Sequence, residues 1–142
     1  MKYLALGFVL LTLLVLNLPA ATQQKTSDDA AVRATVTDYI EGYYTGDAAR
    51  MEKSLHPHYL KHVIHGNIPM GEKTASQIMQ DVRSQAASDV PQAERTAQIR
   101  VLDVSGDIAS AKLVTPHWVD YMTLSRSDGQ WKILSVVQRI DD

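Results

Sequence analysis

The chain has 142 residues, enough for one ordinary domain, and a formal charge of −2 from 14 Lys and Arg against 16 Asp and Glu. The two signs are interspersed and there is no basic tract, which argues against nucleic acid or an anionic membrane surface as a partner. Cysteine is absent, so the fold must depend on packing without disulfides.

The N-terminal segment is unlike the rest of the chain. After Lys2, the run YLALGFVLLTLLVLNLPAA carries no charge and ends in small residues, which is typical of a secretory signal peptide cleaved after Ala20 or Ala21. The alternative is an uncleaved membrane anchor, because residues 3–21 approach the length of about 20 residues that spans a bilayer. We expect the signal peptide.

This interpretation divides the chain into three parts. Residues 1–21 are the signal peptide, residues 22–29 (TQQKTSDD) are a polar, flexible lead-in, and residues 30–142 form one domain. We therefore expect an exported protein, periplasmic or secreted, that has no contact with the membrane once the signal is removed.

Three helices are predicted in the N-terminal half. Apolar residues recur at i, i+4, i+8 and i+11 from Val32 to Tyr43, and Gly46 suits the left-handed position that ends such a helix. Asp47 can cap a second helix, which Pro57 ends. The predicted helices cover residues 27–45, 48–55 and 73–87.

The stretch HPHYLKHVIH, residues 56–65, holds four of the five histidines. On a helix, His58, His62 and His65 would share one face and could bind Zn²⁺. Pro57 disfavours a helix, however, and on a strand His65 points away from the other two. We therefore expect surface histidines and no metal site. The following segment, GNIPMGE, is predicted as a turn region and a candidate lid, since glycines bracket it.

The rest of the domain alternates in the manner of strands, with hairpin turns at 105–107 and 127–129 and a bend at Pro116. The predicted strands cover residues 95–104, 108–119, 120–127 and 130–140, of which the middle two can merge into one strand from 117 to 126. The alternation puts Trp118, Asp120, Met122 and Leu124 on one face, and Trp131, Ile133, Ser135 and Val137 on one face of the last strand. An aspartate among inward-facing apolar residues is the most unusual feature of the sequence.

Helices followed by an antiparallel meander predict an α+β fold. The segments VLDVSGDIASAKLV, WVDYMTLSRSDGQWKILSVV and YIEGYYTGDAARMEKSLHP resemble the Putative lumazine-binding family of the nuclear transport factor 2-like superfamily, over about 30–137. The resemblance implies a cone: three helices packed on a curved antiparallel sheet, a pocket at the mouth, and a homodimer. The sequence departs from the family at Ser135, where asparagine is usual, at Val137-Gln138, where Leu-Trp is usual, and at His58, where an acidic residue is common.

The pocket that the resemblance implies has several candidate residues. The candidate ligand-binding residues are Tyr39, Tyr43, His56, Trp118, Asp120 and Ser135, and the candidate catalytic residues are His56, Asp120 and Tyr39. His56 is either a general base or a cap on the second helix. Tyr39 with Asp120 matches the oxyanion pair of ketosteroid isomerase, or else both are satisfied core residues. Trp118 offers a stacking surface for a pteridine-like ring.

Three functions remain open from the sequence. The first is a module that binds a small, aromatic molecule in an apolar pocket. The second is a cofactor-free isomerase, dehydratase or cyclase in which His56 moves a proton while Asp120 and a tyrosine of the first helix stabilise developing charge. The third is a structural or interaction domain. No cofactor is expected, and the sequence names no ligand or substrate.

Overall fold

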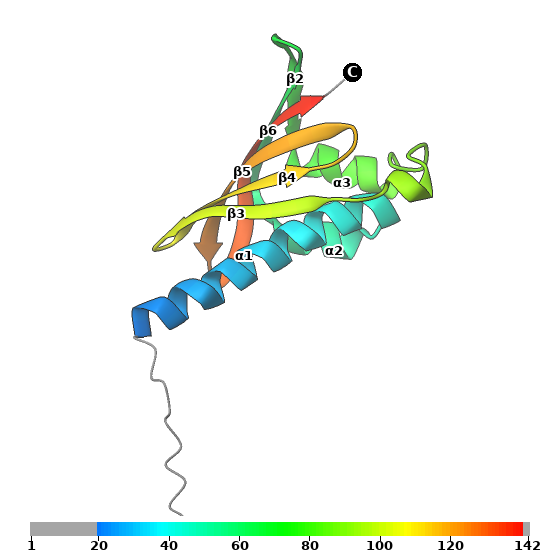
Figure 1. Cartoon of the computed structure of the whole chain (residues 1–142). Helices are drawn as coiled ribbons and strands as arrows, with labels where there is room; N and C mark the ends of the chain where they lie inside the picture. Colours follow the sequence, from blue (N-terminus) through cyan, green and yellow to red (C-terminus); the bar gives the residue numbers. More distant parts are fainter. Residues whose placement is uncertain (1–19, 141–142) are drawn as a thin grey trace, which may run out of the picture.

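The computed structural model describes residues 20–140, so nearly all of the expected signal peptide lies outside the described residues. Within this range no helix is long and apolar enough to cross a bilayer. Figure 1 shows the elements in chain order. They are α1 (Ala20–Thr45), α2 (Ala48–Ser54), β1 (Leu55–His65), β2 (Ile68–Thr74), α3 (Ala75–Arg83), the single turn η1 (Gln92–Glu94), β3 (Gln98–Ser105), β4 (Ile108–Val114), β5 (Trp118–Ser127) and β6 (Gln130–Ile140).

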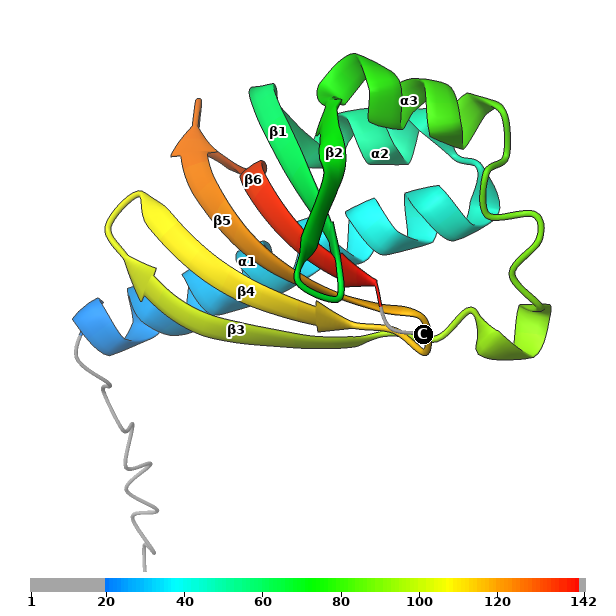
Figure 2. The same ribbon diagram turned by 90° about the horizontal axis from the view of Figure 1, so that it is seen from above.

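The six strands form one curved sheet in the order β2-β1-β6-β5-β4-β3. Every neighbouring pair is antiparallel except β1 and β6, which run parallel. The expectation of an antiparallel sheet is therefore correct for the hairpin β1–β2 and the meander β3 to β6, but the two halves join through a parallel pair. Figure 2 shows α1 lying across one face of the sheet and α2 and α3 lying beyond its β1–β2 end. The α+β cone is confirmed.

The three predicted helices are present, and their ends follow local chemistry. Gly46 has a φ of +71°, which lets the chain leave α1, and the Asp47 side chain accepts a hydrogen bond of 3.0 Å from the backbone N–H of Arg50 to start α2. Thr74 and Gln77 form a capping box at the start of α3. The third helix ends at Arg83, four residues before the predicted end.

The first helix corrects one prediction. It begins at Ala20, so residues 22–29 are helical and not a flexible lead-in. Asp28 supplies a physical reason, because it is buried and its Oδ1 lies 2.9 Å from Nη1 of Arg126 on β5. This contact ties the first turns of α1 to the sheet.

The expected lid is also wrong. Most of GNIPMGE forms strand β2, which pairs with β1 through a two-residue turn at Gly66 and Asn67. Gly66 has a φ of +59°, as such a hairpin turn requires. Ladder hydrogen bonds to β1 hold this segment in the sheet, so its glycines serve the turn and the strand and not a hinge.

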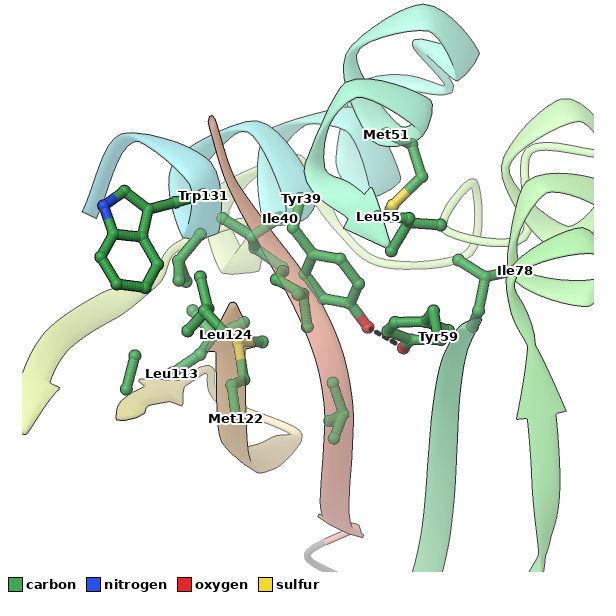
Figure 3. Packing of buried hydrophobic residues seen from close by; sticks show 14 of the residues in the cluster. Tyr39, Ile40, Met51, Leu55, Tyr59, Ile78, Leu113, Met122, Leu124 and Trp131 are labelled. Atoms are coloured by element: carbon green, nitrogen blue, oxygen red, sulfur yellow. Dashed lines mark hydrogen bonds between the residues drawn. The ribbon is translucent and has the colours of Figure 1, made fainter. Parts of the chain in front are cut away.

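The core lies between α1 and the concave face of the sheet (Figure 3). Its central side chains are 2% exposed or less and each stabilises the fold by about 1.5–3 kcal/mol through burial. They include Val32, Val36, Ile40, Leu113, Leu124 and Ile133. Gly42 lies where α1 meets α2, because a Cβ there would come within 2.9 Å of the Met51 backbone nitrogen. The backbone that approaches this glycine most closely is therefore that of Asp47 and the start of α2.

Candidate functional site

The concave face of β5 carries the residues that alternation predicted. Trp118, Asp120, Met122 and Leu124 all point inward, and Asp120 is completely buried. In the ladder, Asp120 lies opposite Leu113 of β4 and Gln138 of β6. A carboxylate is therefore built into the floor of the cone among apolar neighbours.

Strand β6 departs from simple alternation. Thr123 pairs with Ser135 while the next residue, Leu124, pairs with Ile133, so Leu134 is a bulge. Beyond the bulge, each side chain of β6 lies on the face opposite to the one that simple alternation predicts. Ser135 shares the outer face with the exposed Thr123, and Gln138 shares the inner face with Asp120. The prediction that Ser135 and Val137 face inward with Ile133 is wrong for this reason.

Strand β1 brings a second charged residue into the cone. The strand expected for residues 56–65 is confirmed, and His62 lies on its outer face with Nδ1 3.2 Å from Oε1 of Glu72. The inner face carries Tyr59, Lys61 and Val63, of which Tyr59 and Lys61 are buried. Within residues 20–140 there is no group of three His, Asp or Glu side chains placed to hold a metal ion.

Four side chains meet inside the cone and form what we call the buried polar cluster: Tyr39, Tyr59, Lys61 and Asp120. Nζ of Lys61 lies 4.0 Å from Oδ1 of Asp120 and donates a hydrogen bond of 3.3 Å to the Tyr39 hydroxyl. The hydroxyls of Tyr39 and Tyr59 lie 3.3 Å apart, and Figure 3 shows the two rings pointing toward each other from α1 and β1. The cluster therefore links a helix and two strands.

Burial dominates the electrostatics of the buried polar cluster. Burial lowers the pKa of Lys61, and the charge of Asp120 only partly opposes this. Burial likewise raises the pKa of Asp120, against the opposing effects of Lys61, Gln138 and Trp118. Both pKa shifts favour the uncharged forms of the two side chains, the amine of Lys61 and the protonated carboxyl of Asp120. Burial also raises the pKa of the Tyr39 hydroxyl well above its usual value, so Tyr39 stays protonated and able to donate.

The cluster leaves part of its hydrogen-bonding capacity unused. Neither carboxylate oxygen of Asp120, nor the ring nitrogen of Trp118, has a partner with full hydrogen-bond geometry among the described residues, although Gln138 and Trp118 lie close enough to Asp120 to oppose the rise of its pKa. Leaving buried polar atoms unpaired costs about 1–3 kcal/mol each, so this arrangement is expensive for a purely structural core. Such a cost is typical of a functional site.

A cavity of about 300 Å³ opens above the cluster. Lys61 lies on its wall, whereas Asp120 is not part of the lining and lies behind Lys61, Trp118 and Gln138. The aromatic side is made by Tyr43 and Trp118, whose rings are 5.8 Å apart and nearly perpendicular. Gln138 completes the polar part of the lining. At the mouth, Lys73 pairs with Asp81, and Nε2 of His117 lies 2.7 Å from Oε2 of Glu94.

The structure separates the predicted site residues into three groups. Tyr39, Tyr43 and Trp118 line the cavity, and Asp120 lies directly behind it. Ser135 lies on the outer face of the sheet, as described above. His56 lines a different pocket, with Met79, Arg83 and Lys132, and its Nδ1 accepts a hydrogen bond from the backbone N–H of His58.

This separation contradicts the proposed partnership of His56 and Asp120. His56 lines one pocket and Asp120 lies behind the wall of another, so they cannot act on one substrate atom. Tyr59, Lys61 and Gln138 were not among the predicted site residues. The first two could have been identified once residues 56–65 were taken as a strand, because Tyr59, Lys61 and Val63 then alternate onto the inner face. Gln138 could not have been identified in this way, because the bulge at Leu134 determines which face of β6 it lies on.

Comparison with known proteins agrees with the geometry. The chain matches no curated protein sequence. Among solved structures it is similar to a nuclear transport factor 2-like protein of unknown function from Silicibacter pomeroyi DSS-3, with 20% identity, a TM-score of 0.67, and coverage of 82% of this chain and 98% of that one. A second such protein, from Shewanella baltica OS155, has 15% identity, a TM-score of 0.65 and coverage of 89% and 99%.

A third similar structure is described as a putative dehydratase of the same fold family from Streptomyces avermitilis, with 16% identity, a TM-score of 0.55 and coverage of 82% and 98%. At these identities the structures establish the fold. The family is established by the sequence, because residues 27–138 match the family described as "Putative lumazine-binding". The chain is a member of the Putative lumazine-binding family, with a nuclear transport factor 2-like fold.

Proposed function

We propose that the protein binds a small, partly aromatic molecule in the cavity of the cone. The observation that carries this proposal is an open cavity of about 300 Å³ with aromatic walls and a buried lysine–aspartate pair at its inner end. This volume is at the lower limit of small-molecule pockets. The family to which the chain belongs is described by lumazine binding, and that description supports the same class of ligand.

The lining suggests how such a molecule is held. A planar ring lies against Trp118 and Tyr43, which present an edge and a face to it. A carbonyl or other acceptor of the ligand takes a hydrogen bond from Lys61, whose Nζ donates to one hydrogen-bond acceptor, the Tyr39 hydroxyl, within residues 20–140. Gln138 supplies both a donor and an acceptor at the side of the cavity.

A fluorescence titration tests the proposal. The chain has two tryptophans, so Trp131→Phe leaves Trp118 as the only one and makes it a reporter of the cavity. We expect lumazine to quench its emission saturably, and the matched variant Trp118→Leu to lose the binding heat in calorimetry. Absence of binding by lumazine and by a panel of bicyclic heteroaromatic compounds would count against the proposal.

A cofactor-free enzyme is the second candidate, in a changed form. His56 is in another pocket, but the Tyr39 hydroxyl and Lys61 Nζ lie 3.3 Å apart on one cavity wall, close enough to act on neighbouring atoms of one substrate. This would suit an isomerase, dehydratase or cyclase. Turnover of a bound ligand, followed by mass spectrometry, distinguishes this candidate from simple binding.

We also propose that the protein is exported and forms a homodimer. Export is supported by the apolar N-terminal run and its small residues near Ala20 and Ala21. N-terminal sequencing of the protein recovered from its native cells tests export, with a first residue of Ala21 or Thr22 as the expected result. Sedimentation analysis tests the dimer.

A further inference from the structure

We propose that Lys61 is a covalent attachment site, whose amine condenses with an aldehyde or ketone group of a ligand in the cavity to form an imine. The inference rests on the proposed function, because it requires that the cavity accept a small molecule. It goes further by naming the reactive group of that molecule and the atom of the protein that captures it.

The position of Lys61 carries the inference. Its side chain is 8% exposed and lies on the cavity wall beside Val63 and Ile40, so Nζ meets the cavity and little bulk water. The other lysine of the cavity, Lys73, lies at the mouth, is 44% exposed and is paired with Asp81. The two lysines thus differ in solvation and in pairing, and a carbonyl group that enters to the inner end reaches Lys61.

The contacts of Nζ leave it available for reaction. Its hydrogen bond to the Tyr39 hydroxyl is 3.3 Å long. Oδ1 of Asp120 lies 4.0 Å from Nζ, which is too far for a hydrogen bond. Burial lowers the pKa of Lys61, which increases the neutral fraction of the amine at physiological pH. Only the neutral amine is a nucleophile, so the site supports attack on a carbonyl carbon.

The condensation balances without any other reagent. Nζ forms a bond to the carbonyl carbon and the carbonyl oxygen takes a proton, which gives a carbinolamine. The C–O bond then breaks, the oxygen departs as water with both protons that Nζ has lost, and a C=N bond forms. The Tyr39 hydroxyl, which burial keeps protonated, is placed to donate a hydrogen bond to the oxygen as it leaves. The imine nitrogen can then take the proton of the Asp120 carboxyl group, which burial favours in its protonated form, and the resulting carboxylate is the counter-charge of the protonated imine.

Reductive trapping of the wild-type protein tests the inference. The protein is incubated with 2-naphthaldehyde and sodium cyanoborohydride near neutral pH, and the modified lysines are identified by peptide mass mapping. We expect Lys61 to be modified at least about tenfold faster than Lys73 or any surface lysine, because binding of the ring in the cavity holds the aldehyde carbon beside Nζ. Lys61→Arg keeps the charge and should lose the fast labelling, whereas Lys112→Arg, outside the cavity, should keep it.

The controls separate this inference from the proposed function. Calorimetry with 2-naphthalenemethanol measures binding of the same ring without a carbonyl. Binding of this alcohol together with labelling of Lys61 no faster than that of surface lysines would overturn the imine and leave the binding function standing. Absence of binding by the alcohol and by lumazine, together with slow labelling, would overturn both. Fast labelling of Lys73 in place of Lys61 also contradicts the assignment.

Discussion

At the scale of single residues, Lys61 and Asp120 strongly affect the free energy of unfolding. Each is almost completely buried, and each is the main charge that compensates the other. The attraction of a buried pair roughly offsets its desolvation, but removal of one partner leaves the other uncompensated, which typically costs about 3–5 kcal/mol. We therefore expect Lys61→Met to lower the free energy of unfolding by about that amount. Urea denaturation measures it, and Lys61→Met/Asp120→Asn should recover most of the loss.

The same variant should acquire a distinctive pH dependence. Burial raises the pKa of Asp120 above 3.8, and Lys61→Met removes the cation that opposes this rise. A carboxyl whose pKa is higher in the folded state binds its proton more tightly there, so its contribution is full below the unfolded pKa and is lost as pH rises through the folded pKa. The urea midpoint of Lys61→Met should thus fall as the pH rises above about 4, the unfolded pKa of an aspartate, and level off once the pH exceeds the folded pKa. The double variant, which lacks this carboxyl, provides the control and should not show the fall.

Asp120 and Lys61 also illustrate what the sequence can reveal at this scale. Asp120 was identified because it interrupts an apolar alternation, which needs only the assignment of one strand. Lys61 was not predicted, because three of the histidines around it, His56, His58 and His62, favour a surface face on the same strand. The alternation of Tyr59, Lys61 and Val63 along the strand is enough to place Lys61 on the inner face. The contact between Lys61 and Asp120 could not be predicted from the sequence, because it depends on the parallel pairing of β1 with β6.

At the scale of elements, the bulge in β6 limits prediction most. The prediction of a strand at 130–140 is confirmed, and Trp131 and Ile133 face inward as expected. One extra residue at Leu134 then places Gln138 in the cavity and Ser135 on the outer face. Neither glycine nor proline marks the position, because the bulge arises from the fit of β6 to β5 and β1 and not from a local preference.

The junction of α1 and α2 yields a prediction with a definite sign. In an exposed helix, replacing glycine by alanine stabilises by about 1 kcal/mol, but a Cβ at Gly42 would lie 2.9 Å from the Met51 nitrogen and 3.1 Å from the Asp47 carbonyl oxygen. Both are backbone atoms, so α2 would have to move. We expect Gly42→Ala to destabilise by about 1–3 kcal/mol in urea denaturation.

A reciprocal change provides the control for this prediction. Ala34 lies on the exposed side of the same helix, so Ala34→Gly should lose only the helix-propensity term of about 1 kcal/mol. A gain of stability in Gly42→Ala would mean that the contact with α2 relaxes easily.

An ion pair between Asp28 and Arg126 connects the start of α1 to the sheet. Arg126 binds Asp28 and Asp107 at 2.9 Å each, and its guanidinium lies 5.0 Å from the centre of the Trp131 ring. Without Asp28 the first turns are polar and would fray, as the composition of residues 22–29 suggested. We expect Asp28→Asn to speed hydrogen exchange in residues 20–29 by about tenfold, equivalent to about 1.4 kcal/mol. Asp29→Asn, which changes the same charge without touching Arg126, should leave the exchange unchanged.

At the scale of the whole molecule, the cavity follows from the shape of the cone. The sheet curves around α1, buried side chains such as Ile40 and Leu124 lie between the two (Figure 3), and a cavity remains beside Lys61 and Trp118. The fold was predictable because helix periodicity, strand alternation and hairpin turns agreed with one another along the chain. The size of the remaining space was not, since it depends on the curvature of the sheet and on side chains from α1, β1, β5 and β6 together.

Because the cavity is a packing deficit, filling it should separate ligand binding from stability. Val63 is half-buried on the cavity wall, so Val63→Phe places a larger apolar side chain where the ligand would lie. A ligand at 100 times its Kd stabilises the folded state by about 2.7 kcal/mol, which raises the Tm by several degrees. We expect Val63→Phe to abolish the rise that lumazine produces while the Tm of the free protein stays equal or increases, as measured by differential scanning fluorimetry. Val137→Phe makes the same change on the outer face, where the side chain is 44% exposed, and should retain the full rise. An undiminished rise in Val63→Phe would place the ligand outside the cone.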